Sequence, residues 1–274
     1  MKKDNILTYV QLFIIFIFIM FPIYWATVIS LIPGSELYSR SLIPRLLTFE
    51  NYFSIFSSNP LRGLTIYIRN SLIVALLTTF FAILIASFSG YTLARLSFQG
   101  KNLLSSAILL AYVFPPFILM IPLYILFLNY GLLNTYQGLV LAHLFKTTPF
   151  CILMMRSFIM GLPKEFEEAA LIDGCSRVGT ILRVILPLSM PALATIAAFA
   201  FSRSWGEFLF ALIIIEKESI MTLPLGLMRL TFGEVFRWGE IMAGSLIAAI
   251  PPTLIYFLFQ KYTVVGIIGG AIKR

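Results

Sequence analysis

The chain is poor in charge, in cysteine and in histidine, and each shortage excludes a class of protein. Charged residues make up 12% of its 274 residues against 59% hydrophobic ones, which lies outside the composition of a soluble domain. Two cysteines, Cys151 and Cys175, are too few for a disulfide framework. Because His143 is the single histidine, we expect no zinc site of the usual Cys/His kind and no bound metal.

Sequence patterns that mark common enzymes are missing as well. A phosphate-binding loop ending in Gly100-Lys101 needs a glycine five residues upstream, where this chain has Arg95. The metalloprotease pattern H-E-x-x-H and the hydrolase pattern G-x-S-x-G do not occur. The net charge of +8 is scattered between apolar runs, which argues against a nucleic-acid partner. The sequence therefore predicts no catalytic residues and no cofactor bound by this chain.

What the chain has instead is six apolar runs, each long enough to cross a bilayer as a helix. They lie at about residues 6–32, 70–94, 103–128, 137–157, 188–215 and 240–260. Pro115, Pro116 and Pro122 predict a kink in the third run. The first run is too long for a signal peptide and no cleavage site follows it, so we expect a retained helix. These runs predict an all-α membrane protein with about six transmembrane helices, forming one domain over residues 1–274.

The distribution of basic residues predicts the orientation of these spans. Eleven Lys and Arg residues fall on the side of the N-terminus, at 2, 3, 95, 101, 156, 164, 177, 183, 261, 273 and 274. Seven fall on the other side, at 40, 45, 62, 69, 217, 229 and 237. The positive-inside rule then places both termini in the cytoplasm. The sizeable external segments are about 33–69 and 216–239, where an outside partner would bind.

A charged segment of 25 residues, 163–187, interrupts the apolar runs on the predicted cytoplasmic side. Pro163 and three early glutamates at 165, 167 and 168 predict the start of a helix that Gly174 ends in the left-handed conformation. Ser176 can cap a second short helix, which we expect to end before Pro187. Over residues 163–173 the first helix would be about 16 Å long, roughly half of what a bilayer needs.

The outer face of the first short helix is predicted to be a docking surface. Phe166, Ala169 and Ala170 fall on one side at helical spacing, and the two alanines leave a low surface that a partner can approach. The alternative is an amphipathic helix that rests on the lipid surface.

The spacing within this segment resembles the EAA loop of ABC importer permeases, EAA-x3-G-x9-I-x-LP. The matching residues are Glu168-Ala169-Ala170, Gly174 and Val184-Ile185-Leu186-Pro187, with Val184 in place of the usual isoleucine. The ending VVGIIGGAIK, residues 264–273, is similar to permeases of carbohydrate importers of the maltose type. The resemblance implies a type I ABC importer permease whose coupling helix docks on a separate ATPase. The coupling residues it implies are Glu167, Glu168, Ala169, Ala170, Asp173, Gly174, Leu186 and Pro187.

The same resemblance implies partners and a location. They are a second permease chain, two ATPase subunits that use ATP and Mg, and an external solute-binding protein, assembled in the cell membrane. This chain would form half of the path for a sugar or oligosaccharide. An importer of another polar solute, such as a polyamine or a phosphate ester, is the first alternative. A stand-alone secondary transporter is the second, and it leaves the EAA loop unexplained.

Three charged residues fall inside the apolar runs and away from their ends: Lys146, Arg203 and Glu207. Each would cost about 2.5–3.5 kcal/mol if it faced lipid, so we expect them to face protein or water. Arg203 and Glu207 are four residues apart and are predicted to pair along one helix face, which is one interpretation of both charges.

The other interpretation is that these three charges, with His143 and Trp205, border the path of a hydroxylated solute. Aromatic rings stack on the apolar faces of sugars, and charged groups bond their hydroxyls. The stretch of residues 204–209, SWGEFL, resembles the family's W-N-E-F-L pattern, with Gly206 in place of the asparagine.

Overall fold

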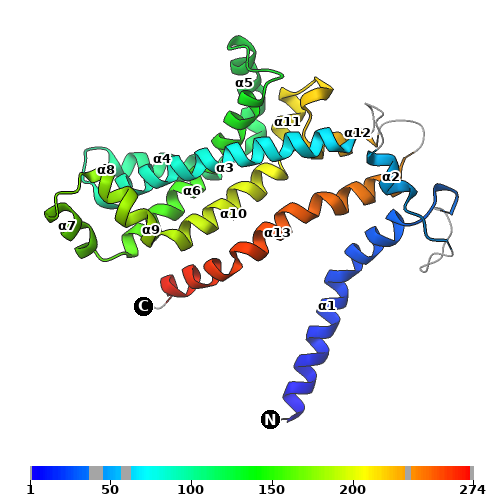
Figure 1. Cartoon of the computed structure of the whole chain (residues 1–274), viewed down its shortest axis with the longest axis horizontal. Helices are drawn as coiled ribbons and strands as arrows, with labels where there is room; N and C mark the ends of the chain where they lie inside the picture. Colours follow the sequence, from blue (N-terminus) through cyan, green and yellow to red (C-terminus); the bar gives the residue numbers. More distant parts are fainter. Residues whose placement is uncertain (1, 37–45, 57–62, 232–235, 272–274) are drawn as a thin grey trace. The chain divides into compact units, whose positions relative to one another are not determined.

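The computed structural model describes residues 2–36, 46–56, 63–231 and 236–271, and the regular elements within those ranges are all helical (Figure 1). Four helices are long and apolar enough to cross a membrane: α1 (Lys2–Ser30), α3 (Leu64–Arg95), α6 (Tyr136–Gly161) and α13 (Trp238–Ala271). Two bent pairs of helices raise the number to six if each pair is one span. The expected all-helical fold with about six spans is therefore confirmed. Five basic residues counted for orientation, at 40, 45, 62, 273 and 274, lie outside the described residues.

The chain divides into two compact units, which we describe separately. Unit 1 comprises residues 1–65 and 226–250 and contains α1, the 3-10 turn η1 (Gly34–Glu36), α2 (Glu50–Phe56) and the beginning of α13. The amide of Asn51 in α2 donates to the carbonyl oxygens of Ser30 and Ile32, at 2.9 and 3.0 Å. Ser54, also in α2, donates to the Glu240 carboxylate at 2.8 Å. These bonds hold α2 against the end of α1 and the start of α13.

Unit 2 comprises residues 66–225 and 251–274 and contains the residues of interest for function. Its core is made by α3, α6 and α10 (Met190–Trp205), which run alongside one another in Figure 1. Met155 and Ile159 of α6 and Ile196 of α10 are fully buried in it. At Gly90 of α3 an added Cβ would lie 2.8 Å from the Cβ of Met155, so only glycine permits this close contact of α3 with α6.

The third apolar run is broken rather than kinked. Its halves, α4 (Lys101–Val113) and α5 (Pro116–Asn129), meet at 99°. Pro115 is extended, with φ −63° and ψ 123°, and Pro116 starts the next helix. Two successive residues without an N–H cannot continue the hydrogen bonding of α4, so the prolines end one helix and begin another. Pro122 lies inside α5.

The fifth apolar run is likewise not one continuous helix, contrary to the prediction from its length. The helix α10 ends at Trp205, and α11 (Leu209–Ile214) begins after a short turn. Glu207 stabilises this break, because its carboxylate accepts hydrogen bonds from the backbone N–H groups of Phe210 and Ala211 at 3.0 and 3.3 Å. Such bonds satisfy N–H groups in the first turn of α11 that have no partner within the helix.

The chain after α11 is bonded to α3. It forms the 3-10 turn η3 (Glu218–Ile220) and then α12 (Leu223–Arg229). The Asn70 amide donates to the carbonyl oxygens of Ser219 and Met221, both at 2.9 Å. The Ser71 hydroxyl accepts from the N–H of Leu223 at 2.7 Å. These buried bonds fix the segment against the first turns of α3.

Candidate functional site

The predicted docking segment begins with the helix α7 (Glu165–Ile172), two residues after Pro163. Gly174 has a φ of +84°, the left-handed conformation expected of it. The N–H groups of Gly174 and Cys175 bond the carbonyl oxygens of Leu171 and Ala170, at 3.1 and 3.0 Å. This pair of bonds is the Schellman arrangement, which satisfies carbonyl groups at the end of a helix.

The second short helix begins as predicted but does not end before Pro187. The Ser176 hydroxyl accepts from the N–H of Gly179 at 3.1 Å and caps α8 (Arg177–Thr180). A π-helical turn, η2 (Ile181–Ile185), then leads into α9 (Leu186–Leu188), which contains Pro187. The wider turn opens the helix where the proline ring would crowd the carbonyl of Arg183. The chain bends by 81° only after Leu188, where α10 begins.

The exposed face of α7 differs in part from the predicted one. Phe166, Ala169 and Ile172 follow one another at intervals of three, and their side chains are exposed, with Ile172 at 85%. Glu168, Asp173 and Gly174 are exposed too. Ala170, predicted to lie on this face, is buried because α7 packs on the rest of unit 2. Of the other two predicted coupling residues, Pro187 is exposed, and Leu186 is half-buried against the core.

Glu167 faces its own chain, although it was predicted to contact an ATPase. Its carboxylate accepts a hydrogen bond from the Tyr91 hydroxyl and lies 3.1 Å from Nε of Arg95. Arg95 also donates to the carbonyl oxygen of Leu162 at 2.8 Å. Tyr91 and Arg95 belong to the end of α3, and Leu162 follows α6. This buried contact, the Tyr91–Arg95–Glu167 anchor, holds α7 to both helices.

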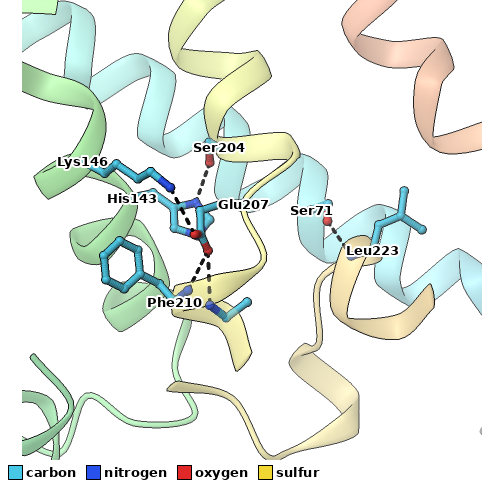
Figure 2. Close-up of polar contacts among 8 residues, drawn as sticks. Ser71, His143, Lys146, Ser204, Glu207, Phe210 and Leu223 are labelled. Atoms are coloured by element: carbon cyan, nitrogen blue, oxygen red, sulfur yellow. Dashed lines mark hydrogen bonds and ion pairs between the residues drawn. The ribbon is translucent and has the colours of Figure 1, made fainter. Parts of the chain in front are cut away.

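Lys146 and His143 both approach the carboxylate of Glu207 (Figure 2). Glu207 is 4% exposed; its Oε1 lies 3.6 Å from Nζ of Lys146, and its Oε2 lies 3.5 Å from Nε2 of His143. The other ring nitrogen of His143, Nδ1, is 2.7 Å from the Ser204 hydroxyl. This carboxylate compensates the half-buried Lys146 ammonium and fixes the start of α11. Its contacts therefore hold α6, α10 and α11 together in the free chain.

The predicted pair of Arg203 and Glu207 is wrong. Because α10 ends at Trp205, the four-residue spacing no longer brings the two side chains to one helix face. In the described part of the chain, the side chains that contact the Glu207 carboxylate are His143 and Lys146. Arg203 is exposed instead. Trp205 is buried and stacks on Phe201, with ring centroids 5.7 Å apart, so it belongs to the core.

Lys146 and Arg203 share a cavity of about 190 Å³. Four aromatic side chains contribute to its wall: Tyr112, Phe114, Phe145 and Phe210. None of these four aromatic residues was predicted from the sequence as a site residue, and Tyr112 and Phe114 lie at the end of the third apolar run's first half. The sequence feature that could have indicated Tyr112 and Phe114 is the adjacent Pro115-Pro116 pair. The break between α4 and α5 falls at this pair, and Tyr112 and Phe114 line the cavity there together with residues of α6 and α10. This volume is smaller than the roughly 300–1,000 Å³ of typical small-molecule sites in proteins.

Comparison with known proteins agrees with this architecture. Residues 82–267 match the family "Binding-protein-dependent transport system inner membrane component". The trehalose/maltose transport system permease protein MalG of Thermococcus litoralis is 36% identical over 256 residues, which are 93% of this chain and 91% of MalG. The sulfoquinovosyl glycerol transport system permease protein SmoH of Agrobacterium fabrum is 35% identical over 257 residues, 93% of this chain and 89% of SmoH.

The fold is similar to that of a solved transporter. A chain of a bacterial ABC transporter involved in the import of the acidic polysaccharide alginate superposes with a TM-score of 0.83 at 22% sequence identity, covering 96% of this chain and 97% of that one. The length of each match extends beyond the segment that first suggested the family. This chain, a multi-pass membrane protein and a transport component rather than an enzyme, therefore belongs to the family of inner membrane permease subunits of binding-protein-dependent ABC importers.

Proposed function

We propose that this permease forms half of the membrane path for a sugar or oligosaccharide. Three relatives align with more than nine-tenths of this chain. Their names refer to the transport of trehalose and maltose, of sulfoquinovosyl glycerol and of diacetylchitobiose. The partners in this proposal are a second permease subunit, two ATPase subunits that bind ATP and Mg, and an external solute-binding protein. The termini and residues 163–187 lie in the cytoplasm.

The exposed apolar face of α7 is the observation that carries the proposed coupling. Phe166, Ala169 and Ile172 present an apolar surface on a helix of eight residues, or about 12 Å, that is too short to span a bilayer. Val178 and Leu182 extend the exposed apolar residues beyond Gly174. A groove on an ATPase subunit would cover this surface. Movement of the ATPase pair on binding ATP would then move α7, and the Tyr91–Arg95–Glu167 anchor would pass that movement to α3.

The first test is the dependence on partners. Reconstituted alone in liposomes, this chain should move no sugar, with or without ATP. Addition of the second permease, the ATPase subunits and the solute-binding protein should give uptake that requires hydrolysable ATP. The measurement is accumulation of a labelled sugar in the liposomes. Uptake by the single chain without ATP would support a stand-alone secondary transporter and contradict the proposal, whereas ATP-driven uptake of a polyamine but of no sugar would correct only the solute.

The second test concerns the Tyr91–Arg95–Glu167 anchor. Glu167→Ala should reduce sugar uptake by about tenfold or more while ATP hydrolysis continues, because α7 would no longer follow α3 closely. Breaking one side of a buried pair also costs stability, by about 3–5 kcal/mol, so the yield of folded protein should fall. Glu165→Ala is the matched control, since Glu165 is an exposed glutamate of the same helix and is not among the coupling residues that the resemblance implies.

The Arg95→Ala, Glu167→Ala double variant separates folding from coupling. It removes both charges, so it should recover much of the yield without recovering uptake per ATP hydrolysed. If uptake per ATP returned to the wild-type value in that variant, the anchor would serve folding only and would have no part in coupling.

A further inference from the structure

The cavity beside Glu207 has an excess of positive charge. Lys146 and Arg203 both line it, and its described lining contains no acidic residue. Glu207 lies behind Lys146, 4% exposed, and can compensate only one of the two cations. One of its oxygens already accepts two backbone hydrogen bonds from α11, and the other is nearest to Lys146. The guanidinium of Arg203 therefore remains without a counter-charge among the described residues.

The position of Arg203 along its helix makes a lipid headgroup an unsuitable counter-charge. Arg203 is thirteen residues into α10, about 20 Å from its start. Lys146 is ten residues into α6, about 15 Å from its start at Tyr136. Counted from helix starts at the membrane surface, both distances are well within a hydrocarbon layer about 30 Å thick. Charges at that depth are retained where they face a partner or a solute path.

The aromatic wall of the same cavity fits a ring-shaped solute. Tyr112, Phe114 and Phe145 offer apolar faces beside the two cations. An aromatic ring stacks on the apolar face of a sugar, while a guanidinium binds a carboxylate, sulfonate or phosphate through two parallel hydrogen bonds. A neutral sugar would use the aromatic wall and leave Arg203 without a counter-ion.

We propose that this cavity receives the anionic group of an acidic sugar, with Arg203 as the principal residue for that group and Lys146 as a second positive charge. The inference rests on the proposed function and specifies its solute: a sugar or short oligosaccharide that carries a carboxylate, sulfonate or phosphate. Arg203 acts here as a residue that determines specificity, and Glu207 sets how much of the charge on Lys146 remains available.

The test uses the assembled transporter in lipid nanodiscs without its solute-binding protein, so that selection by the membrane subunits is measured alone. The probes are three labelled pairs that differ only in the acidic group: glucuronate with glucose, galacturonate with galactose, and mannuronate with mannose. Equilibrium dialysis should show that at least one acidic sugar is retained about tenfold more tightly than its neutral counterpart. Arg203→Gln should remove this difference, and Arg203→Lys, which keeps the charge but not the two parallel hydrogen bonds, should keep only part of it. Lys217→Gln, which neutralises an exposed lysine outside the cavity, is the control for a general effect of charge.

Four results would overturn the inference. The first is equal retention of acidic and neutral sugars in every pair, including no retention of any of them. The second is a preference for acidic sugars that survives in Arg203→Gln. The third is loss of the second permease from the purified Arg203→Gln complex without a change in preference, because Arg203 would then pair with a carboxylate of that subunit. ATP-driven uptake of a neutral sugar that is unaffected by Arg203→Gln would refute this inference while leaving the proposed function intact.

Discussion

Replacing Gly174 with valine is expected to leave the permease inserted in the membrane and to uncouple ATP hydrolysis from uptake. Gly174 has a φ of +84°, which glycine adopts freely and a β-branched residue adopts only with strain. The left-handed conformation costs an ordinary residue about 1–2 kcal/mol, a factor of about 5–30 in the population of the native turn. Since the turn joins α7 to α8, its loss should change the angle at which α7 meets an ATPase.

The measurement compares ATP hydrolysis with uptake in the reconstituted complex. We expect Gly174→Val to lower uptake by about tenfold or more while hydrolysis loses its stimulation by the loaded binding protein. Gly161→Val is a matched control. Gly161 ends α6 close to the same segment, its φ lies outside the left-handed region, and an added Cβ would meet no atom within 4 Å. Normal stimulation and normal uptake in Gly174→Val would show that this turn does not set the coupling geometry.

The second large effect is expected at Glu207. Glu207→Leu leaves Lys146 without its counter-charge and leaves the N–H groups of Phe210 and Ala211 without an acceptor. Loss of one member of a buried pair costs about 3–5 kcal/mol, a large part of the stability of a typical domain. The variant should therefore yield little folded protein, as measured by monodisperse protein after purification and by thermal unfolding.

Two further variants distinguish the roles of the Glu207 charge and of its hydrogen bonds. Glu207→Gln keeps an oxygen that can accept from Phe210 and Ala211, so it should fold better than Glu207→Leu even though it lacks the charge. The Lys146→Met, Glu207→Leu double variant removes both charges but not the need for an acceptor, so it should recover only part of the lost stability. If Glu207→Leu unfolded at the wild-type temperature, the ion pair with Lys146 would contribute nothing measurable to the fold.

The local structure of the docking segment could be predicted because it depends on neighbouring residues. The N–H groups of Gly174 and Cys175 end α7 by bonding carbonyl groups three and five positions before them, and Ser176 caps α8 through a bond to Gly179. Hydrogen bonds between residues this close along the chain depend on residue type and spacing, so the sequence predicts them. The length of the apolar runs likewise predicts membrane spans, since a helix rises by a constant distance per residue.

The contacts between distant residues could not be predicted in the same way. The sequence places Glu207 four residues after Arg203, and only the end of α10 at Trp205 shows that this spacing is irrelevant. Lys146 and His143 reach Glu207 from α6, about sixty residues earlier in the chain. In the same way Glu167, one residue before the EAA triplet, contacts Arg95 of α3 rather than a partner surface.

The sequence by itself determined the class of protein, the number of spans within the limits of the bent pairs, and the local structure of the segment that we propose for coupling. Composition, helix length and turn residues act locally. Only the tertiary structure decided which face of α7 is exposed, which cation Glu207 compensates, and that Lys146 and Arg203 share one cavity with aromatic side chains of the α4–α5 break. The physical reason is that burial and charge pairing depend on how helices pack across the bilayer. A buried charge pairs with the group of opposite charge that this packing places next to it.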